Sequence, residues 1–239
     1  MSLGVIGGLG PMATAYFMEL IIKMTKADTD QEHLEMIIYN CPQIPDRTAF
    51  ILGKSKENPL PRIIELGQRL EKQQVECIAI PCITAHYFHE EISKEISAEV
   101  IHGIRECGKL LQEAGAEKIG IMATDGTIES RIFQEELEKM GMEVVIPDQA
   151  HQKMVMSLIY DDVKAGKAPN MDNFQKVGNY LKERGTQVII LGCTELSIIK
   201  KDNEIGSGYL DAMEALARAS ILSCGKKVNS EYETLFDLQ

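Results

Sequence analysis

A short apolar stretch that ends in a cysteine occurs twice in this chain, and this repeat constrains the fold more than any other feature. The segment IAIPCITAH (78–86) matches IILGCTELS (189–197), which places Cys82 and Cys193 at equivalent positions. The opening segment VIGGLGPMAT has a weaker partner in IGIMATDGT, and a similar length of chain separates Ile6 from Ile121. Two similar offsets predict two similar halves.

Short β-rich runs alternate with amphipathic stretches along the whole chain, and the order predicts parallel sheets flanked by helices. We expect strands at 3–6, 36–40, 77–80, 118–122, 143–146 and 187–191. Helices are expected at 11–26, 61–73, 104–114, 127–140 and 210–223, with one after Thr84 and two before 187. The predicted fold is therefore α/β, with two pseudo-symmetric Rossmann-like domains and an active site in the cleft between them. The first domain would comprise 1–102 plus 208–239, whose helix returns to it, and the second 103–207.

Charge and cysteine usage narrow the classes of partner. The chain has 25 Lys and Arg against 36 Asp and Glu, a net charge of −11, which disfavours nucleic acid as a ligand. Apolar runs are too short to span a membrane, and the N-terminus does not read as a signal peptide, so we expect a cytoplasmic protein. Six cysteines without a C-x-x-C pair predict free thiols.

The two matched cysteines each follow a predicted strand and precede a predicted helix. Open parallel sheets place their ligands at this edge, and the N–H groups of a helix start favour a thiolate there. Two such thiols facing one cleft would place a proton acceptor on each side of a small carbon acid. That geometry predicts racemisation, in which one sulfur removes the α-proton and the other delivers one.

A packing role is the alternative for any cysteine, because free cysteine is among the most buried residue types. We assign Cys41, Cys77, Cys107 and Cys224 mainly to packing. For Cys82 or Cys193 considered alone, a packing role and a functional role are equally favoured. Their equivalent positions in the repeat favour the functional role. A disulfide between these two is disfavoured by the expected compartment.

The segments GVIGGLGPMAT, IPDRT, IPCITAH and LGCTEL resemble, in order and spacing, those of the aspartate/glutamate racemase family, particularly its aspartate racemase branch. The resemblance covers nearly the whole chain. It implies a pseudo-symmetric two-domain fold, cofactor-independent racemisation of aspartate or glutamate, and commonly a homodimer. A wider amino-acid range is also open. No cofactor and no metal is expected, and the substrate would be a small amino acid.

One position departs from the family pattern. The family usually has asparagine after the first cysteine, where this chain has Ile83, and isoleucine cannot form the amide's hydrogen bonds. Backbone N–H groups at Ile83, Thr84 and Ala85 could still bind a carboxylate at the helix start. Substrate choice or efficiency is therefore expected to differ more than the fold.

Two cations are candidates to hold a carboxylate of the substrate. Arg47, in a predicted loop after Pro45 and Asp46, offers a guanidinium that can bind a carboxylate bidentately and matches the family's substrate-binding arginine. Lys164 matches a lysine that aspartate racemases use near the distal carboxylate, although it could also cap a helix, and Lys153 competes with it.

Four further residues lie near the expected cleft. Thr84 and Thr194 could bind substrate or cap helices, and Met12 and Thr14 line the first turn. Glu195, in the first turn after the second cysteine, could orient groups around Cys193.

Three other functions remain open from the sequence. Gly8, Gly10 and Ala13 formally satisfy a dinucleotide fingerprint, which would indicate a nicotinamide-dependent oxidoreductase, but strand 36–40 ends in Asn40 rather than an acid. A metal site drawn through His86, His89 and Glu90 lacks the usual ligand spacing. With Ile83 present, the protein could also bind an amino acid or dicarboxylate without turning it over.

Overall fold

Two parallel four-stranded sheets form the framework of the chain, and the computed structural model describes residues 2–238. The first sheet has the order β2-β1-β3-β4 and the second β6-β5-β7-β8, so the two halves share one topology. All the pairings are parallel. The strands are β1 (Ser2–Gly7), β2 (Glu35–Asn40), β3 (Cys77–Ala79), β4 (Glu99–Val100), β5 (Lys118–Met122), β6 (Glu143–Val145), β7 (Val188–Leu191) and β8 (Tyr209–Asp211). The predicted α/β fold of two similar halves is confirmed.

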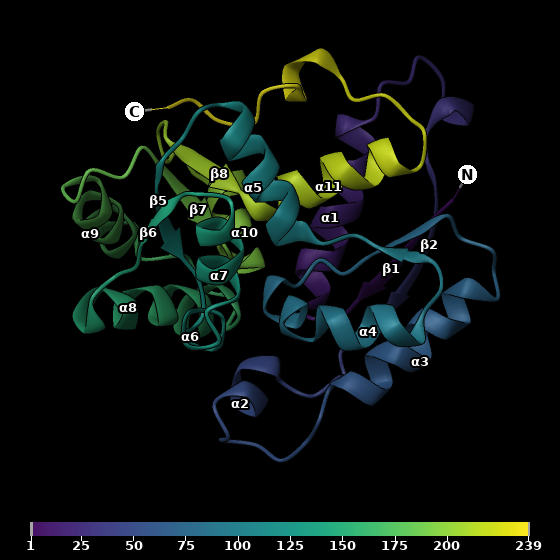
Figure 1. Ribbon diagram of the computed structural model, residues 1–239, viewed down its shortest axis with the longest axis horizontal. Coiled ribbons are helices and arrows are strands. Elements are labelled where there is room, and N and C mark those ends of the chain that lie inside the picture. Colours follow the sequence, from purple (N-terminus) through teal and green to yellow (C-terminus); the bar gives the residue numbers. More distant parts are fainter. Residues whose placement is uncertain (1, 239) are drawn as a thin grey trace.

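Helices cover both sheets, and the two halves lie side by side in Figure 1. The first half carries α1 (Pro11–Met24), α2 (Arg47–Ile51), α3 (Leu60–Glu71), α4 (His89–Glu95) and α5 (Gly103–Glu113). The second carries α6 (Asp125–Glu129), α7 (Ile132–Lys139), α8 (Gln149–Met156), α9 (Met171–Lys182), α10 (Thr194–Asp202) and α11 (Ala212–Ser223). Short 3₁₀ segments occupy Asp30–Glu32, Ile83–Phe88 and Ser230–Tyr232, and a π-helical segment spans Ser157–Val163.

One apolar core is shared by both halves. Phe17 of α1, Phe133 of α7 and Leu216 of α11 are fully buried in the same cluster. Smaller clusters around Leu66 and Phe174 lie on the other side of the first and second sheet, respectively. Helix α11 contacts α1, α5 and β3, so it packs against elements of the first half.

Three elements differ from the sequence prediction. The expected helix 210–223 begins only at Ala212, because Tyr209–Asp211 forms β8 and pairs with β7. These three residues therefore lie in the second sheet, and the predicted boundary at 207/208 falls just before them. The two-residue strand β4 was not predicted at all. The expected helix 127–140 is two helices, α6 and α7, separated at Arg131, whose φ is 57°.

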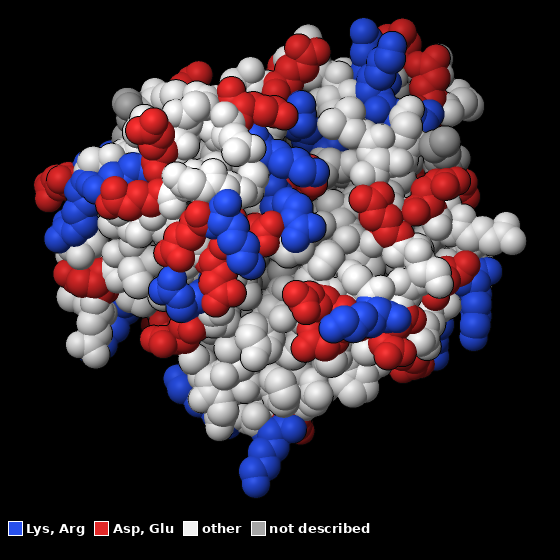
Figure 2. Space-filling model, viewed as in Figure 1, with Lys and Arg blue, Asp and Glu red and all other residues white. Residues whose placement is uncertain are grey.

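The surface carries no broad field of one sign on the face shown in Figure 2, where acidic and basic side chains are interspersed. Within residues 2–238, none of the helices is both long and apolar enough to cross a lipid bilayer.

Candidate active site

The repeated strand-cysteine motif places two sulfur atoms at the carboxyl ends of β3 and β7. Cys82 and Cys193 have extended backbones, with φ of −151° and −144°, and each precedes a helical segment. Both line one small cavity, which we call the thiol cavity, and they are only 6% and 7% exposed. The thiol cavity encloses about 10 Å³, room for about one water. A molecule larger than water does not fit the thiol cavity as it stands in this structure.

Cys193 lies against a carboxylate. Its Sγ donates a hydrogen bond of 2.9 Å to Oε2 of Glu195, and Oγ1 of Thr194 donates to the same oxygen at 3.0 Å. Burial raises the pKa of the Cys193 thiol well above its ordinary value, and the neighbouring Glu195 charge adds to the rise. This surrounding keeps Cys193 in its protonated form.

Cys82 lies against a cation instead. Arg47 is the first residue of α2, a helix that the side chain of Asp46 caps. The residue is only 8% exposed, and its guanidinium lies beside Cys82. Burial acts to lower the pKa of Arg47, but the charges of Cys82 and Asp46 outweigh it and the pKa is raised. The guanidinium places a positive charge next to this sulfur atom.

The arrangement of Arg47 corrects one expectation from the sequence. Its guanidinium donates to the carbonyl oxygens of Leu9 at 2.9 Å, Pro45 at 3.0 Å and Ile44 at 3.3 Å. Arg47 therefore lies in a helix rather than a loop, and most of its donors are already taken by backbone. Three of the five N–H groups of its guanidinium thus donate to backbone oxygens, and Nε has no partner.

Lys164 borders the same cavity from the second half. Lys164 directly follows the π-helical segment. Its Nζ lies 4.1 Å from the ring centre of Tyr160 and 4.0 Å from Oε1 of Glu195. Burial acts to lower the pKa of Lys164, but Glu195 and Cys193 outweigh it and the pKa is raised. The competing Lys153 is exposed and does not line either cavity described here.

Four threonine hydroxyls join the two halves beside the thiols. Oγ1 of Thr84 lies 3.2 Å from that of Thr124 and 3.0 Å from that of Thr127. Thr48 donates to Thr124 at 3.2 Å. Since Thr48 and Thr84 come from the first half and the other two from the second, this cluster fixes the halves across the cleft.

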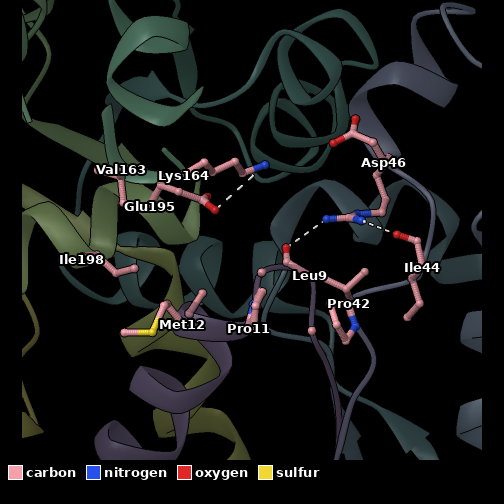
Figure 3. Close-up of a pocket in the computed structure, with 14 residues that line it drawn as sticks. Leu9, Pro11, Met12, Pro42, Ile44, Asp46, Val163, Lys164, Glu195 and Ile198 are labelled. Carbon is pink, nitrogen blue, oxygen red and sulfur yellow. Dashed lines mark hydrogen bonds and ion pairs between the residues drawn. The ribbon is translucent and has the colours of Figure 1, made fainter. Parts of the chain in front are cut away.

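A larger outer cavity of about 470 Å³ adjoins the thiol cavity. Figure 3 shows Lys164 and Glu195 on one side of it, with Asp46 and Leu9 across the opening. Its wider part is apolar, with Met12, Val163 and Ile198 on its wall. The two cavities share the residues Leu9, Asp46, Arg47, Lys164 and Glu195.

Comparison with known proteins agrees with this geometry. Residues 6–220 match the model of the Asp/Glu/Hydantoin racemase family. The chain belongs to this family. It is 31% identical over 229 residues to the broad specificity amino-acid racemase RacX of Bacillus subtilis, covering 92% of this chain and 96% of the relative. It is 28% identical to the glutamate racemase of Aquifex aeolicus, over 70% of this chain and 65% of that protein.

Solved structures give the same assignment. The aspartate racemase of Picrophilus torridus superposes with a TM-score of 0.82 at 31% identity, covering 98% of this chain and 99% of that one. A glutamate racemase from Francisella tularensis, in complex with D-glutamate, has a TM-score of 0.60 at 20% identity, covering 91% and 78%, which shows the common fold. The predicted isomerase of the aspartate/glutamate racemase type is confirmed, and nothing in these relatives favours an oxidoreductase.

The remaining candidate residues are only partly in the site of this racemase-family chain. Ile83, Thr84 and Thr194 line the thiol cavity, and Met12, 73% exposed, lines the outer one. Ala85 does not line either cavity, and its N–H donates to the carbonyl of Cys82 at 3.0 Å, so it is not free to bind a carboxylate.

Thr14 supports the glycine turn rather than facing the substrate. Its Oγ1 accepts from the N–H of Gly8 at 2.8 Å and donates to the carbonyl of Gly10 at 3.0 Å. Gly8 has a φ of 92°, and a side chain there would meet the backbone of Cys41. Gly8 thus has a structural reason that does not involve a dinucleotide.

The three histidines near Cys82 form a packed group. His86 lies 5.7 Å and His89 lies 4.3 Å from His102, measured between ring centres. Burial lowers the pKa of His86 to about 4 and that of His102 to about 3. Among the described residues, no cluster of three or more His, Cys, Asp or Glu side chains is arranged to hold a metal ion.

Sequence reasoning missed Asp46, Thr48, Thr124 and Tyr160 as site residues. Asp46 caps α2 and accepts a hydrogen bond of 3.4 Å from the Tyr160 hydroxyl across the cleft. Thr124 had a usable signal, because it lies in IGIMATDGT, the partner of the opening glycine turn. The sequence around Tyr160 carries no such signal, since this residue reaches the site only through tertiary packing.

Proposed function

We propose that the protein interconverts the enantiomers of an acidic amino acid, aspartate or glutamate, without a cofactor, and that Cys82 and Cys193 are its two acid–base groups. One observation carries this proposal. The two sulfur atoms line a single cavity from matching halves, and one lies beside a cation while the other lies beside a carboxylate.

The opposite surroundings prepare one base and one acid. Cys82, beside Arg47, accepts the α-proton of the bound amino acid. Cys193, held as a thiol by Glu195, delivers its own proton to the opposite face of the carbanion. The product is the other enantiomer, and the sulfur atoms have exchanged protonation states. Lys164, whose charge opposes that of Glu195 at Cys193, stabilises the new thiolate.

The substrate's carboxylates have separate partners. Ile83 and Thr84 present N–H groups at the start of the 3₁₀ segment, where an α-carboxylate would bind, with the hydroxyl of Thr194 opposite. Lys164 remains as the cation for a distal carboxylate, because backbone carbonyls occupy Arg47. Arg47 therefore acts through Cys82 rather than on the side chain of the substrate.

The outer cavity supports a wider substrate range than aspartate and glutamate. Its apolar wall at Met12, Val163 and Ile198 offers nothing to a carboxylate but fits an uncharged side chain. The relative from Bacillus subtilis is named a broad specificity amino-acid racemase, which agrees with this feature.

We also propose that the protein works in the cytoplasm as a homodimer. Met18 and Ile22 on α1 and Leu222 on α11 are exposed apolar side chains available for self-association. Size-exclusion chromatography with light scattering measures the mass directly, and a strictly monomeric mass would contradict the dimer.

Deuterium incorporation tests the central proposal. L-aspartate, L-glutamate and L-methionine are each incubated with the protein in D₂O, and α-exchange and the enantiomer ratio are followed by NMR and chiral chromatography. We expect racemisation with α-deuterium that added pyridoxal phosphate does not accelerate. A protein that only binds its ligand would give no exchange.

Single cysteine variants assign the two bases. Cys82→Ala and Cys193→Ala should each abolish net racemisation, while exchange from one enantiomer can persist through the remaining sulfur. Cys107→Ala, at a buried cysteine outside both cavities, is the matched control and should retain turnover. Full turnover in both single variants would overturn the two-thiol mechanism.

A further inference from the structure

A second pair of cysteines lies far from the thiol cavity. Sγ of Cys77 and Sγ of Cys224 are 3.1 Å apart, and both side chains are 1% exposed. The sequence alone assigned these residues to packing, and neither lines the thiol cavity or the outer cavity. Two sulfur atoms at this separation need little movement to bond.

The pair connects elements that are distant along the chain. Cys77 begins β3, inside the first sheet, and Cys224 is the residue that ends α11. Helix α11 starts directly after β8, which belongs to the second sheet, and then crosses to contact β3. A bond between these sulfur atoms would therefore attach the helix that bridges the halves to the first sheet.

We propose that Cys77 and Cys224 form an oxidisable dithiol, which a peroxide converts to a disulfide that fastens α11 to β3. One sulfur attacks the O–O bond of hydrogen peroxide, giving a sulfenic acid and releasing the first water. The sulfur of the second cysteine then attacks the sulfenic sulfur, its proton leaves with the hydroxyl as a second water, and the S–S bond forms. Two thiols and one peroxide thus give one disulfide and two waters.

Local chemistry makes Cys224 the first sulfur to react. The hydrogen bond from Cys77 lowers the pKa of Cys224, which increases its thiolate fraction. Cys224 also lies at a helix end, directly before Gly225 with its φ of 69°, and helix ends open more readily than helix interiors. Such opening admits a small oxidant to a side chain that is otherwise covered.

Peptide mapping tests the bond itself. A Cys82→Ser/Cys193→Ser double variant removes the thiols of the cleft, so peroxide treatment reports on the other cysteines alone. After denaturation and alkylation, we expect the mass of two lost hydrogen atoms and a cross-linked peptide joining Cys77 to Cys224. Recovery of both cysteines fully alkylated, under conditions that oxidise the wild-type Cys82, would overturn the proposal.

Thermal unfolding tests the consequence. The two cysteines are 147 positions apart, and closing so long a loop should raise the melting temperature of the oxidised protein by about 5 to 10 °C over the reduced one. Cys224→Ala should remove this difference, and so should Cys77→Ala if the first variant is poorly folded. Cys107→Ala, whose residue is equally buried, should retain it. An equal shift in the Cys224 and Cys107 variants would contradict the assignment.

Discussion

The two halves present the same strand-cysteine motif with opposite electrostatics. Cys82 lies beside the buried guanidinium of Arg47, whereas Cys193 donates to the carboxylate of Glu195. The repeated sheets position both sulfur atoms, but the charged partners differ, because Arg47 comes from α2 and Glu195 from the first turn of α10. The fold therefore supplies the symmetry of the site, and a few side chains supply the difference between its acid and its base.

A second pair of equivalent places shows the same contrast. Four residues after each cysteine, the first half has His86 and the second has Ser197. His86 packs against His102, which caps α5, while Ser197 donates at 2.6 Å to Asp211, which caps α11. His102 comes shortly after the fourth strand of the first sheet, and Asp211 is the last residue of the fourth strand of the second. Because one pair is basic and the other acidic, the halves should respond to pH in opposite directions.

The largest effect is expected at Arg47. Arg47→Met removes the cation beside Cys82 and should lower kcat/KM by about 10³-fold, for aspartate and for a neutral amino acid alike. Alkylation of Cys82 by iodoacetamide should slow in parallel, while Arg47→Lys should retain more of both. A rise in KM for aspartate alone would instead support the direct carboxylate contact that the sequence suggested.

Glu195 should give the next largest effect. Glu195→Gln removes the acceptor that holds the Cys193 thiol and should lower kcat by about 10²-fold. It should also lower the pKa of Cys193, since the carboxylate charge helps to raise it. Alkylation of Cys193 at fixed pH should then become faster, and an unchanged rate would show that Glu195 does not act on this sulfur.

The first half should lose stability in acid. Burial lowers the pKa of His86 to about 4, so the native state resists protonation that the unfolded chain accepts near 6.5. Its contribution is fully present above pH 6.5 and is lost as the pH falls toward 4. Between pH 7 and pH 5, urea unfolding of the wild type should therefore lose about 2 kcal/mol more than unfolding of His86→Asn. Equal losses of unfolding free energy in the wild type and in His86→Asn would contradict a neutral buried His86.

The second half should show the reverse dependence. Burial and the nearby Asp211 raise the pKa of Glu214 to about 7, so its stabilising contribution is present below about 4.5 and is lost as the pH rises through 7. Glu214→Gln should gain about 2 kcal/mol in unfolding free energy relative to the wild type between pH 5 and pH 8. Lys200, 2.7 Å from Glu214, acts to lower the pKa of this carboxyl and so keeps the gain from being larger. If the difference in unfolding free energy between Glu214→Gln and the wild type stays constant from pH 5 to pH 8, Glu214 does not titrate in this range.

Ile83 should give the smallest effect on activity. Ile83→Asn restores the amide that related chains usually have and should lower the KM for aspartate about threefold, the value of one hydrogen bond. Because Ile83 is 2% exposed, the same change should also lower the melting temperature. Ile83→Leu serves as the control without an amide, and an equal KM in both variants would show that the amide is not used.

The sequence predicted the features that local patterns determine. Each cysteine follows an apolar run and precedes a helical segment, so its place at the edge of a sheet could be predicted. The parallel direction of the strands in both halves followed from the alternation of elements. Helix α2 was missed because Pro45 and Asp46 suggest a turn, although Asp46 is in fact the cap of that helix. Strand β8 was missed because its apolar residues continue directly into α11.

Other features depend on contacts between the halves. The hydroxyl group of Thr124 meets Thr48 and Thr84 only when the two sheets are placed together. The direction of the Arg47 side chain likewise depends on the carbonyl of Leu9, which is distant in sequence. No local pattern contains this information.

Helices α5 and α11 each follow the fourth strand of their own sheet, and they pack against each other near the middle of the molecule. Such an arrangement is what a half-length ancestor would leave behind if it paired with a second copy through this helix and its gene was then duplicated in tandem. In that ancestor both sulfur atoms would have had identical neighbours. Because both halves belong to one chain, the neighbours of the two sulfur atoms can differ, with arginine on one side and glutamate on the other.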